Sequence, residues 1–145
     1  MKKRGTTIGI AGDHAGFSLK GVIVRHLENQ GFSVRDYGTF SEESVDYPDF
    51  IHPLAEAVVS GRHEKGIIIC GSGNGVSMTA NKHAGIRAAL SWMPEIARLA
   101  RAHNDANVLA LPARFIDLPQ ALEVVDVFLN TAFEGGRHLN RIKKI

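Results

Sequence analysis

The sequence has few of the features that form disulfide bonds, membrane-spanning segments or secretion signals. Its 145 residues include one cysteine, Cys70, so no internal disulfide can form. A lone thiol is typical of a reducing compartment, and we expect the protein to work in the cytoplasm. No run approaches the roughly 20 apolar residues that span a bilayer. The basic residues 1–4 imitate the start of a secretory signal, but the apolar run behind them is short and meets Asp13.

Net charge and aromatic residues are also scarce. The formal charge is only +2, and the basic residues are scattered except at the two ends. The aromatic residues are seven phenylalanines, two tyrosines and one tryptophan, and none alternates with a basic run as a nucleic-acid stacking platform requires. We therefore expect neither a nucleic-acid partner nor a membrane partner.

Short apolar runs alternate with helical patterns along the chain, which predicts βαβ units and a parallel sheet. The predicted strands cover residues 7–11, 32–37, 65–70, 86–90 and 108–111, and the predicted helices cover 14–30, 50–60, 75–82, 94–102 and 118–130. The fold class is thus α/β, a doubly wound, Rossmann-like five-stranded parallel sheet with helices on both faces. The length and the absence of a linker predict a single domain over residues 1–145, with a basic tail at 134–145. We expect this tail to contact a second subunit.

Residues 67–75 carry the strongest functional pattern. Three isoleucines in a row predict a strand covered on both faces, and Cys70 stands where this strand enters a glycine-rich loop. In open α/β sheets that loop lies at the ligand-binding edge. The glycines at 71, 73 and 75 allow backbone N–H groups to turn inward around an anion. A thiol beside such a loop is suited to a substrate that carries or develops negative charge.

A second polar group, Asp13-His14, follows the first predicted strand and opens on the same edge as Cys70. Each residue also has a structural interpretation. Asp13 stands at a helix N-cap position, His14 suits an ordinary first turn, and Cys70 suits a small buried hydrophobe. Their coincidence on one edge favours function.

The glycine loop differs from the known nucleotide and phosphatase loops. A Walker loop needs lysine and then serine or threonine after its last glycine, where this chain has Val76 and Ser77. The glycines alternate strictly, unlike a dinucleotide fingerprint, and no acidic residue stands about 20 positions on. No arginine between Cys70 and Arg87 closes a phosphatase loop. We expect no cofactor, and without a ligand-spaced histidine or cysteine cluster we expect no metal.

Two more polar clusters lie at residues 103–105 and 137–141. If the tail is helical, Arg137 and Arg141 stand one turn apart and together can bind a phosphate dianion, while a solvated face explains them equally well. His103 ends a predicted helix that runs back across the sheet, away from the edge of Cys70. A second subunit is the way to bring it there.

Six segments match one known family in order and at matching spacing. They are residues 12–17, 70–75, 80–82, 85–87, 103–105 and 135–138. Together they resemble the type B ribose-5-phosphate isomerases, a family that includes the galactose-6-phosphate isomerase subunits. The resemblance covers nearly the whole chain.

This resemblance implies a cofactor-free aldose–ketose phosphate isomerase that works as a homodimer or a dimer of dimers with shared active sites. The implied reaction converts ribose 5-phosphate to ribulose 5-phosphate, with galactose 6-phosphate or allose 6-phosphate as the alternative substrate. By position, the resemblance makes Cys70 the base, assigns ring opening to His103 and places Ser72 with the 71–75 backbone at the enediolate. The remaining substrate contacts that it implies are Asp13, His14, Gly71, Gly73, Asn74, Gly75, Asn104, Arg114, Arg137 and Arg141, the three arginines holding the phosphate.

Position 76 marks the subtype. Some relatives lack the cysteine and place a glutamate base where this chain has Val76, so the thiol version is favoured here. Ser72 replaces a threonine and keeps its hydroxyl. The chemistry also suits the residues, because a free cysteine has a pKa of about 8.5 and is partly thiolate near neutrality. Each N–H donor aimed at a developing oxyanion contributes about 3 to 4 kcal/mol.

Two other classes of function are compatible with the same residues. The first is a hydrolase in which Cys70 attacks the substrate and His103 activates the thiol. The second is a noncatalytic module that binds phosphorylated metabolites. Solvent deuterium incorporation distinguishes the isomerase from both.

Overall fold

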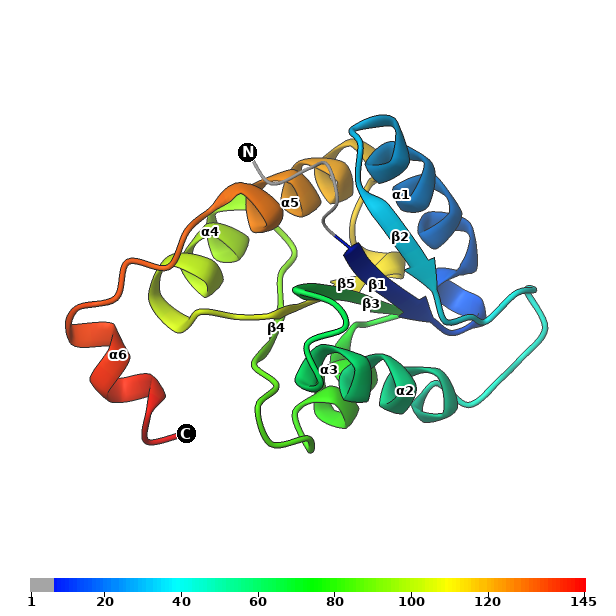
Figure 1. The fold of residues 1–145 in the computed structure, drawn as a ribbon. Coiled ribbons are helices and arrows are strands. Elements are labelled where there is room, and N and C mark those ends of the chain that lie inside the picture. The colour runs from blue at the N-terminus through cyan, green and yellow to red at the C-terminus, as the bar shows by residue number, and fades with distance from the viewer. Residues whose placement is uncertain (1–6) are drawn as a thin grey trace.

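Five parallel strands form one twisted sheet in the order β2-β1-β3-β5-β4 (Figure 1). The coordinates are a computed structural model that describes residues 7–145, so the basic residues 1–4 lie outside the described part. The strands are β1 (Thr7–Gly12), β2 (Ser33–Asp36), β3 (Lys65–Cys70), β4 (Ala88–Leu90) and β5 (Val108–Pro112). All five predicted strands are present, and the predicted parallel sheet is confirmed.

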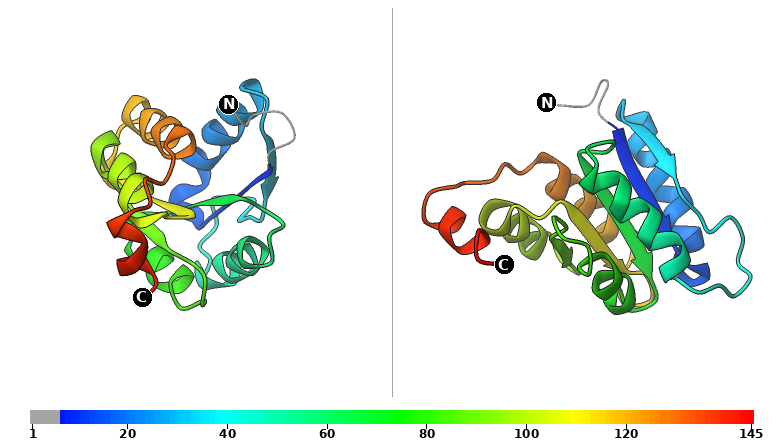
Figure 2. Two further views of the ribbon diagram at one scale, coloured as in Figure 1. Left: turned by 60° about the vertical axis from the view of Figure 1, so that its left-hand side comes forward. Right: turned by 60° about the horizontal axis from the view of Figure 1, so that its bottom comes forward.

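Helices cover both faces of this sheet, as the two further views show (Figure 2). They are α1 (Phe17–Asn29), α2 (Pro48–Val59), α3 (Asn74–Ala80), α4 (Pro94–Asn104), α5 (Leu118–Asn130) and α6 (Arg137–Ile142), with short 3₁₀ turns η1 (His14–Gly16) and η2 (Ala113–Phe115). Helices α1, α4 and α5 pack on one face, and α2 and α3 pack on the other (Figure 1). The doubly wound prediction is therefore confirmed. In the part of the chain that the structure describes, no helix combines the length and apolar character needed to cross a membrane.

The core follows the two-residue period of the strands. In β3, Ile67 and Ile69 point to the face of α1, α4 and α5, whereas Ile68 and Cys70 point to the face of α2 and α3. All three isoleucines are completely buried. A run of β-branched residues is thus explained by burial on both sides of a central strand.

The element boundaries differ from the predicted ones where side chains or turns replace regular hydrogen bonds. Strand β2 begins after Phe32, because the Phe32 N–H closes the end of α1 by donating to Leu27 O. Strand β4 begins after Arg87, whose N–H donates to the side chain of Asn107. Helix α4 continues to Asn104 and is ended by the left-handed Asp105.

The strand order creates a switch point between β1 and β3. From β1 the chain passes through α1 to β2 on one side, and from β3 it passes through α3 toward β4 on the other. The loops after β1 and β3 therefore leave the sheet toward opposite faces, which opens a crevice at their carboxyl ends. Both predicted polar loops, at Asp13 and at Cys70, lie at this crevice.

Candidate active site

Cys70 closes β3 directly beside the end of β1. Gly12 is the register partner of Ile69, and the Asp13 N–H donates to Ile69 O at 3.1 Å. The cysteine packs with Ala11 and Val76 on the face of α2 and α3 and keeps 6% of its surface exposed. Cys70 is therefore a nearly buried residue at the carboxyl edge of the sheet.

The glycine loop folds back over this sulfur. The Gly73 N–H donates to Cys70 Sγ at 3.2 Å, and Gly73 has a φ of 77°. A Cβ on Gly73 would overlap Leu90 Cδ1, so glycine is needed there for space as well as for conformation. At the next turn the Asn74 N–H donates to Ser72 Oγ at 3.2 Å, and both residues are exposed.

Gly75 lies where the aromatic ring of Tyr47 approaches the loop. A Cβ at this position would overlap the ring of Tyr47, which precedes α2. Tyr47 also packs against the cluster that contains Cys70. The loop from residue 71 to 75 is thus wedged between an aromatic ring and strand β5, and this packing fixes its backbone N–H groups.

Asp13 and His14 have structural partners at the same edge. Asp13 Oδ1 accepts the N–H groups of Ala15 at 3.0 Å and Gly16 at 3.3 Å, so the N-cap interpretation is confirmed. His14 Nδ1 accepts the Val45 N–H at 3.2 Å and so holds the long loop before α2. Both side chains stand beside the crevice while serving the local fold.

Arg114 joins this group from η2. Its backbone N–H donates to Gly71 O at 3.0 Å, and a Cβ on Gly71 would lie 3.2 Å from a guanidinium nitrogen of Arg114. The residue is exposed. The structure therefore brings Arg114 into contact with the glycine loop, which gives the crevice a cationic wall.

His103 and Asn104 lie at the opposite edge of the sheet. They end α4, and shortly after them Asn107 O accepts the Gly66 N–H at the start of β3. Gly66 and Cys70 are four residues apart in β3, a separation of about 13 Å along the strand. Within one chain, His103 is therefore kept away from the sulfur, as the direction of its helix predicted.

His103 has two neighbours that the sequence analysis missed. Its ring stacks on that of His138 with centroids 4.2 Å apart and 14° between the planes. Glu134 Oε1 lies 3.8 Å from His103 Nε2 and 3.7 Å from His138 Nε2. The Glu134 N–H donates to Ala102 O at 2.9 Å, which fixes this segment on α4. Only the four-residue spacing of Glu134 and His138 hinted at the pair.

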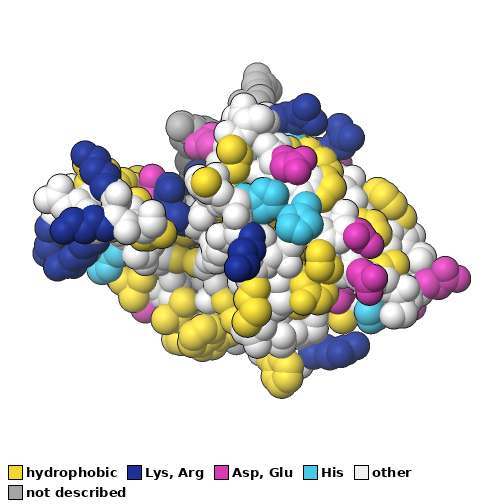
Figure 3. Space-filling view, turned by 90° about the horizontal axis from the view of Figure 1, so that it is seen from below, with side chains coloured by type: hydrophobic (Ala, Val, Ile, Leu, Met, Phe, Trp, Pro, Cys, Tyr) yellow, Lys and Arg dark blue, Asp and Glu magenta, His cyan; other side chains and the backbone are white. Residues whose placement is uncertain are grey.

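The tail is helical, as α6. Arg137 and Arg141 are four residues apart on it and both are exposed. Figure 3 shows Lys and Arg side chains gathered at this end of the molecule. Burial is the main cause that lowers the pKa of His138, and the positive charges of His103 and Arg137 lower it further.

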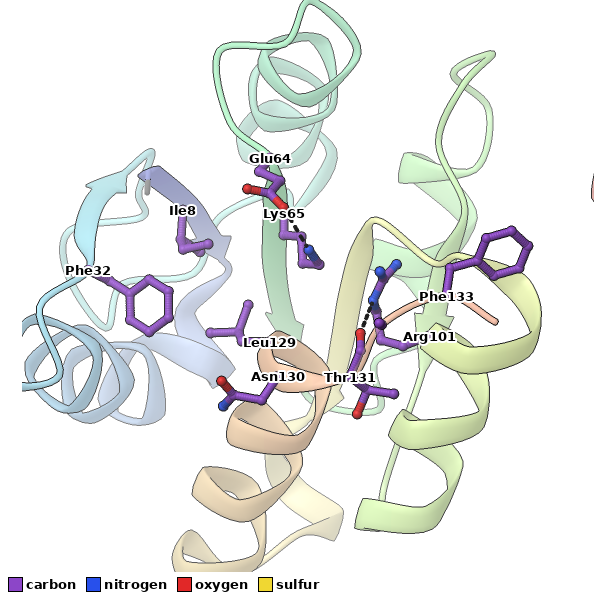
Figure 4. Close-up of a pocket in the computed structure, with 10 residues that line it drawn as sticks. Ile8, Phe32, Glu64, Lys65, Arg101, Leu129, Asn130, Thr131 and Phe133 are labelled. Carbon is purple, nitrogen blue, oxygen red and sulfur yellow. Dashed lines mark hydrogen bonds and ion pairs between the residues drawn. The ribbon is translucent and has the colours of Figure 1, made fainter. Parts of the chain in front are cut away.

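Two hollows lie away from Cys70. One, of about 330 Å³, opens at the amino ends of β1 and β3 and includes Ile8, Phe32 and Leu129 (Figure 4). Its Arg101 donates to Thr131 O. The other hollow, of about 350 Å³, is bordered by Asn81, Arg87 and Asn104. The first contains none of the predicted site residues and the second contains only Asn104.

Residues 8–145 match the family model described as ribose/galactose isomerase. The chain belongs to this family. Ribose-5-phosphate isomerase B of Escherichia coli is 48% identical over 133 residues, which are 92% of this chain and 89% of that protein. The resemblance seen in the sequence is therefore confirmed.

Solved structures of ribose/galactose isomerase family members have the same fold. Ribose-5-phosphate isomerase B of Clostridium thermocellum has a TM-score of 0.95 and 50% identity, over 96% of this chain and 94% of that one. The Mycoplasma genitalium ribose-5-phosphate isomerase B, solved with bound ribulose-5-phosphate, has a TM-score of 0.93 and 44% identity, over 97% and 94%. The range matched by the family model, residues 8–145, includes both edges of the sheet and the tail.

Proposed function

We propose that this protein interconverts ribose 5-phosphate and ribulose 5-phosphate, with Cys70 as the base. The observation that carries the proposal is the position of the Cys70 sulfur under a loop of glycine N–H groups at the β1–β3 switch point. Membership of the family and the ribulose-5-phosphate bound to a relative support the substrate. We also propose that the whole chain acts as one isomerase domain.

The reaction moves one proton between adjacent carbons. The thiolate of Cys70 takes the proton from the carbon next to the aldehyde, and the electron pair of that C–H bond shifts to give an enediolate with the charge on the former carbonyl oxygen. Within the enediolate, the hydroxyl proton on the oxygen of the second carbon moves to the former carbonyl oxygen, which becomes a hydroxyl. The same sulfur returns the carbon proton to the former carbonyl carbon, and the oxygen of the second carbon becomes the ketone. In this proposal, the Ser72 hydroxyl and the N–H groups of the loop stabilise the oxyanion.

The site needs a second subunit, and we propose a homodimer or a dimer of dimers. One chain holds Cys70, Arg114 and the loop at one sheet edge, and His103 at the other. The exposed basic face of α6 complements an acidic segment at the other end of the molecule, formed by the loop before α2 and the first turn of that helix (Figure 1). Its acidic residues are Glu42, Glu43, Asp46 and Asp49. A two-fold dimer joins these ends twice and completes two sites.

In this dimer, His103 of the partner subunit opens the sugar ring. The imidazole takes the proton of the anomeric hydroxyl, the bond from the anomeric carbon to the ring oxygen breaks as the aldehyde forms, and the ring oxygen receives the proton. The partner's Arg137 and Arg141 hold the phosphate together with Arg114, and the partner's Asn104 binds hydroxyls. Because the phosphate does not react, its binding energy positions the sugar over the thiol.

The substrate assignment is tested by turnover of ribose 5-phosphate, allose 6-phosphate and galactose 6-phosphate in heavy water. We expect the highest kcat/KM with ribose 5-phosphate and deuterium on the carbon next to the carbonyl. A preference for a hexose phosphate would move the assignment to that substrate. Release of phosphate, or thermal stabilisation without turnover, would instead support a hydrolase or a binding module.

Shared sites are tested by mixing two inactive variants. Cys70→Ala and His103→Ala each remove one half of every site, whereas a mixed dimer has one site with both residues intact. After subunit exchange of equal amounts, half of the dimers are mixed, so about a quarter of wild-type activity should return. If the mixture stays as inactive as its components, the two residues do not meet across subunits.

We further propose that the enzyme works in the cytoplasm. A lone thiol that must act as a base is best kept reduced there, and Cys70 has no second cysteine to pair with. Fractionation of cells that express the protein checks this directly, and recovery with a secreted marker would contradict it.

A further inference from the structure

Glu134, His103 and His138 form a group of ionisable side chains that the proposed reaction uses only at His103. A carboxylate and two imidazoles are also the donor set of a zinc site, and their ligand atoms lie within 4.8 Å of one another. The imidazoles, however, are stacked with only 14° between their planes. Their lone pairs therefore lie in two nearly parallel planes, which does not suit coordination of one ion by both rings, and Arg137 adds positive charge.

The geometry points to a different use. We propose that Glu134 is a positioning residue that sets the tautomer and the orientation of His103 for ring opening. This inference rests on the proposed function, because it assumes that His103 acts on the cyclic sugar. Glu134 itself touches neither the substrate nor the reacting atoms.

The carboxylate faces one nitrogen of His103. Oε1 of Glu134 is 3.8 Å from Nε2, so the negative charge favours the tautomer with the proton on that nitrogen. Nδ1 is then the acceptor, and within residues 7–145 no hydrogen bond to it is present. The arrangement leaves a free lone pair to take the proton of the anomeric hydroxyl.

His138 supports the same orientation from the side. Its stacked ring blocks rotation of the half-exposed His103 ring, and its own Nε2 lies 3.7 Å from the same carboxylate oxygen. Burial and the neighbouring positive charges lower the pKa of His138, which favours the neutral form of this ring. Backbone bonding of Glu134 to Ala102 O keeps the carboxylate near α4.

A comparison of ribose 5-phosphate with ribulose 5-phosphate as substrates separates ring opening from proton transfer. Ribose 5-phosphate is mainly a closed furanose, whereas ribulose 5-phosphate is open-chain, because its 5-hydroxyl is esterified and cannot close a five-membered ring. Glu134→Gln should therefore lower turnover of ribose 5-phosphate by about tenfold, the low end for an acid–base contribution. Exchange of solvent deuterium into ribulose 5-phosphate should stay within about twofold of wild type. Glu134→Asp, which retains the charge, should recover part of the lost turnover.

The matched control is Glu123→Gln, which removes the same charge from an exposed position on α5. It should leave both rates unchanged. Equal loss of both rates in Glu134→Gln, or no loss in either, would overturn the positioning role while wild type still turns over ribose 5-phosphate. Failure of the wild-type protein to act on ribose 5-phosphate would instead overturn the proposed function.

Discussion

Gly73→Ala is the substitution whose effect the structure determines most closely. A left-handed φ of 77° costs a residue with a Cβ about 1 to 2 kcal/mol. The new methyl group would also overlap Leu90 Cδ1 and approach the backbone of Leu111, and forcing an extra carbon into packed surroundings costs about 1 to 3 kcal/mol more. We expect a loss of about 2 to 5 kcal/mol in the free energy of unfolding if the loop holds its position.

The loop has a second way to respond, which is to move away from Leu90. A shift of about 1 Å would take the Gly73 N–H off Cys70 Sγ and misalign the oxyanion donors, at a cost of about 100-fold in kcat/KM. Urea unfolding and turnover of ribose 5-phosphate measure both responses.

Gly61→Ala is the matched control for this substitution. Its φ is 84°, and nothing lies within 4 Å of the position of a new Cβ. Gly61→Ala should lose only the free energy that a left-handed φ costs a residue with a Cβ, about 1 to 2 kcal/mol, and should keep full activity. A Gly73→Ala protein with wild-type activity and no more loss of stability than Gly61→Ala would refute the reasoning.

Three further substitutions test the phosphate site, a buried ion pair and a buried histidine. Arg137→Ala should raise KM and also lower kcat with ribose 5-phosphate, because the phosphate positions the sugar. A change in KM alone would show that Arg137 binds the substrate and the transition state equally well. Asp36→Asn should lower the free energy of unfolding, measured with urea, by about 3 kcal/mol, because it leaves the 2%-exposed ammonium of Lys20 without its counter-charge. Lys20→Met should lower it by less, and the reverse order would contradict this reasoning. Burial lowers the pKa of His63 below 6.5, so the folding free energy should be full above pH 6.5 and fall as the pH drops toward the folded-state pKa. When the free energy of unfolding is measured from pH 7.5 to pH 5, it should depend less on pH in His63→Asn than in the wild-type protein. The same pH dependence in both proteins would show that other groups cause it.

The fold was predictable because its pattern is local. The isoleucines before Cys70 read as a strand covered on both faces, and the structure buries them completely. Boundaries were less accurate where a distant partner decides them. Strand β4 is short because the Arg87 N–H is taken by the side chain of Asn107, twenty residues later. No local propensity reports such a contact.

The site was predictable at the edge where strands end. Parallel strands bring their carboxyl ends together, so the loops at Asp13 and Cys70 were expected at one edge. The Asp13 N–H does donate to Ile69 O, the residue before Cys70. Glu134 and His138 were not recognised, because their nearness to His103 depends on how the tail folds back onto α4. A glutamate in a polar tail resembles any solvated side chain until that packing is known.

The central claim is that one sulfur carries the proton. Solvent deuterium exchange into ribulose 5-phosphate, followed by NMR in Cys70→Ala, measures this step without ring opening. We expect exchange to fall to background while the sugar phosphate still binds and stabilises the protein against heat. Exchange at the wild-type rate in Cys70→Ala would show that another group is the base.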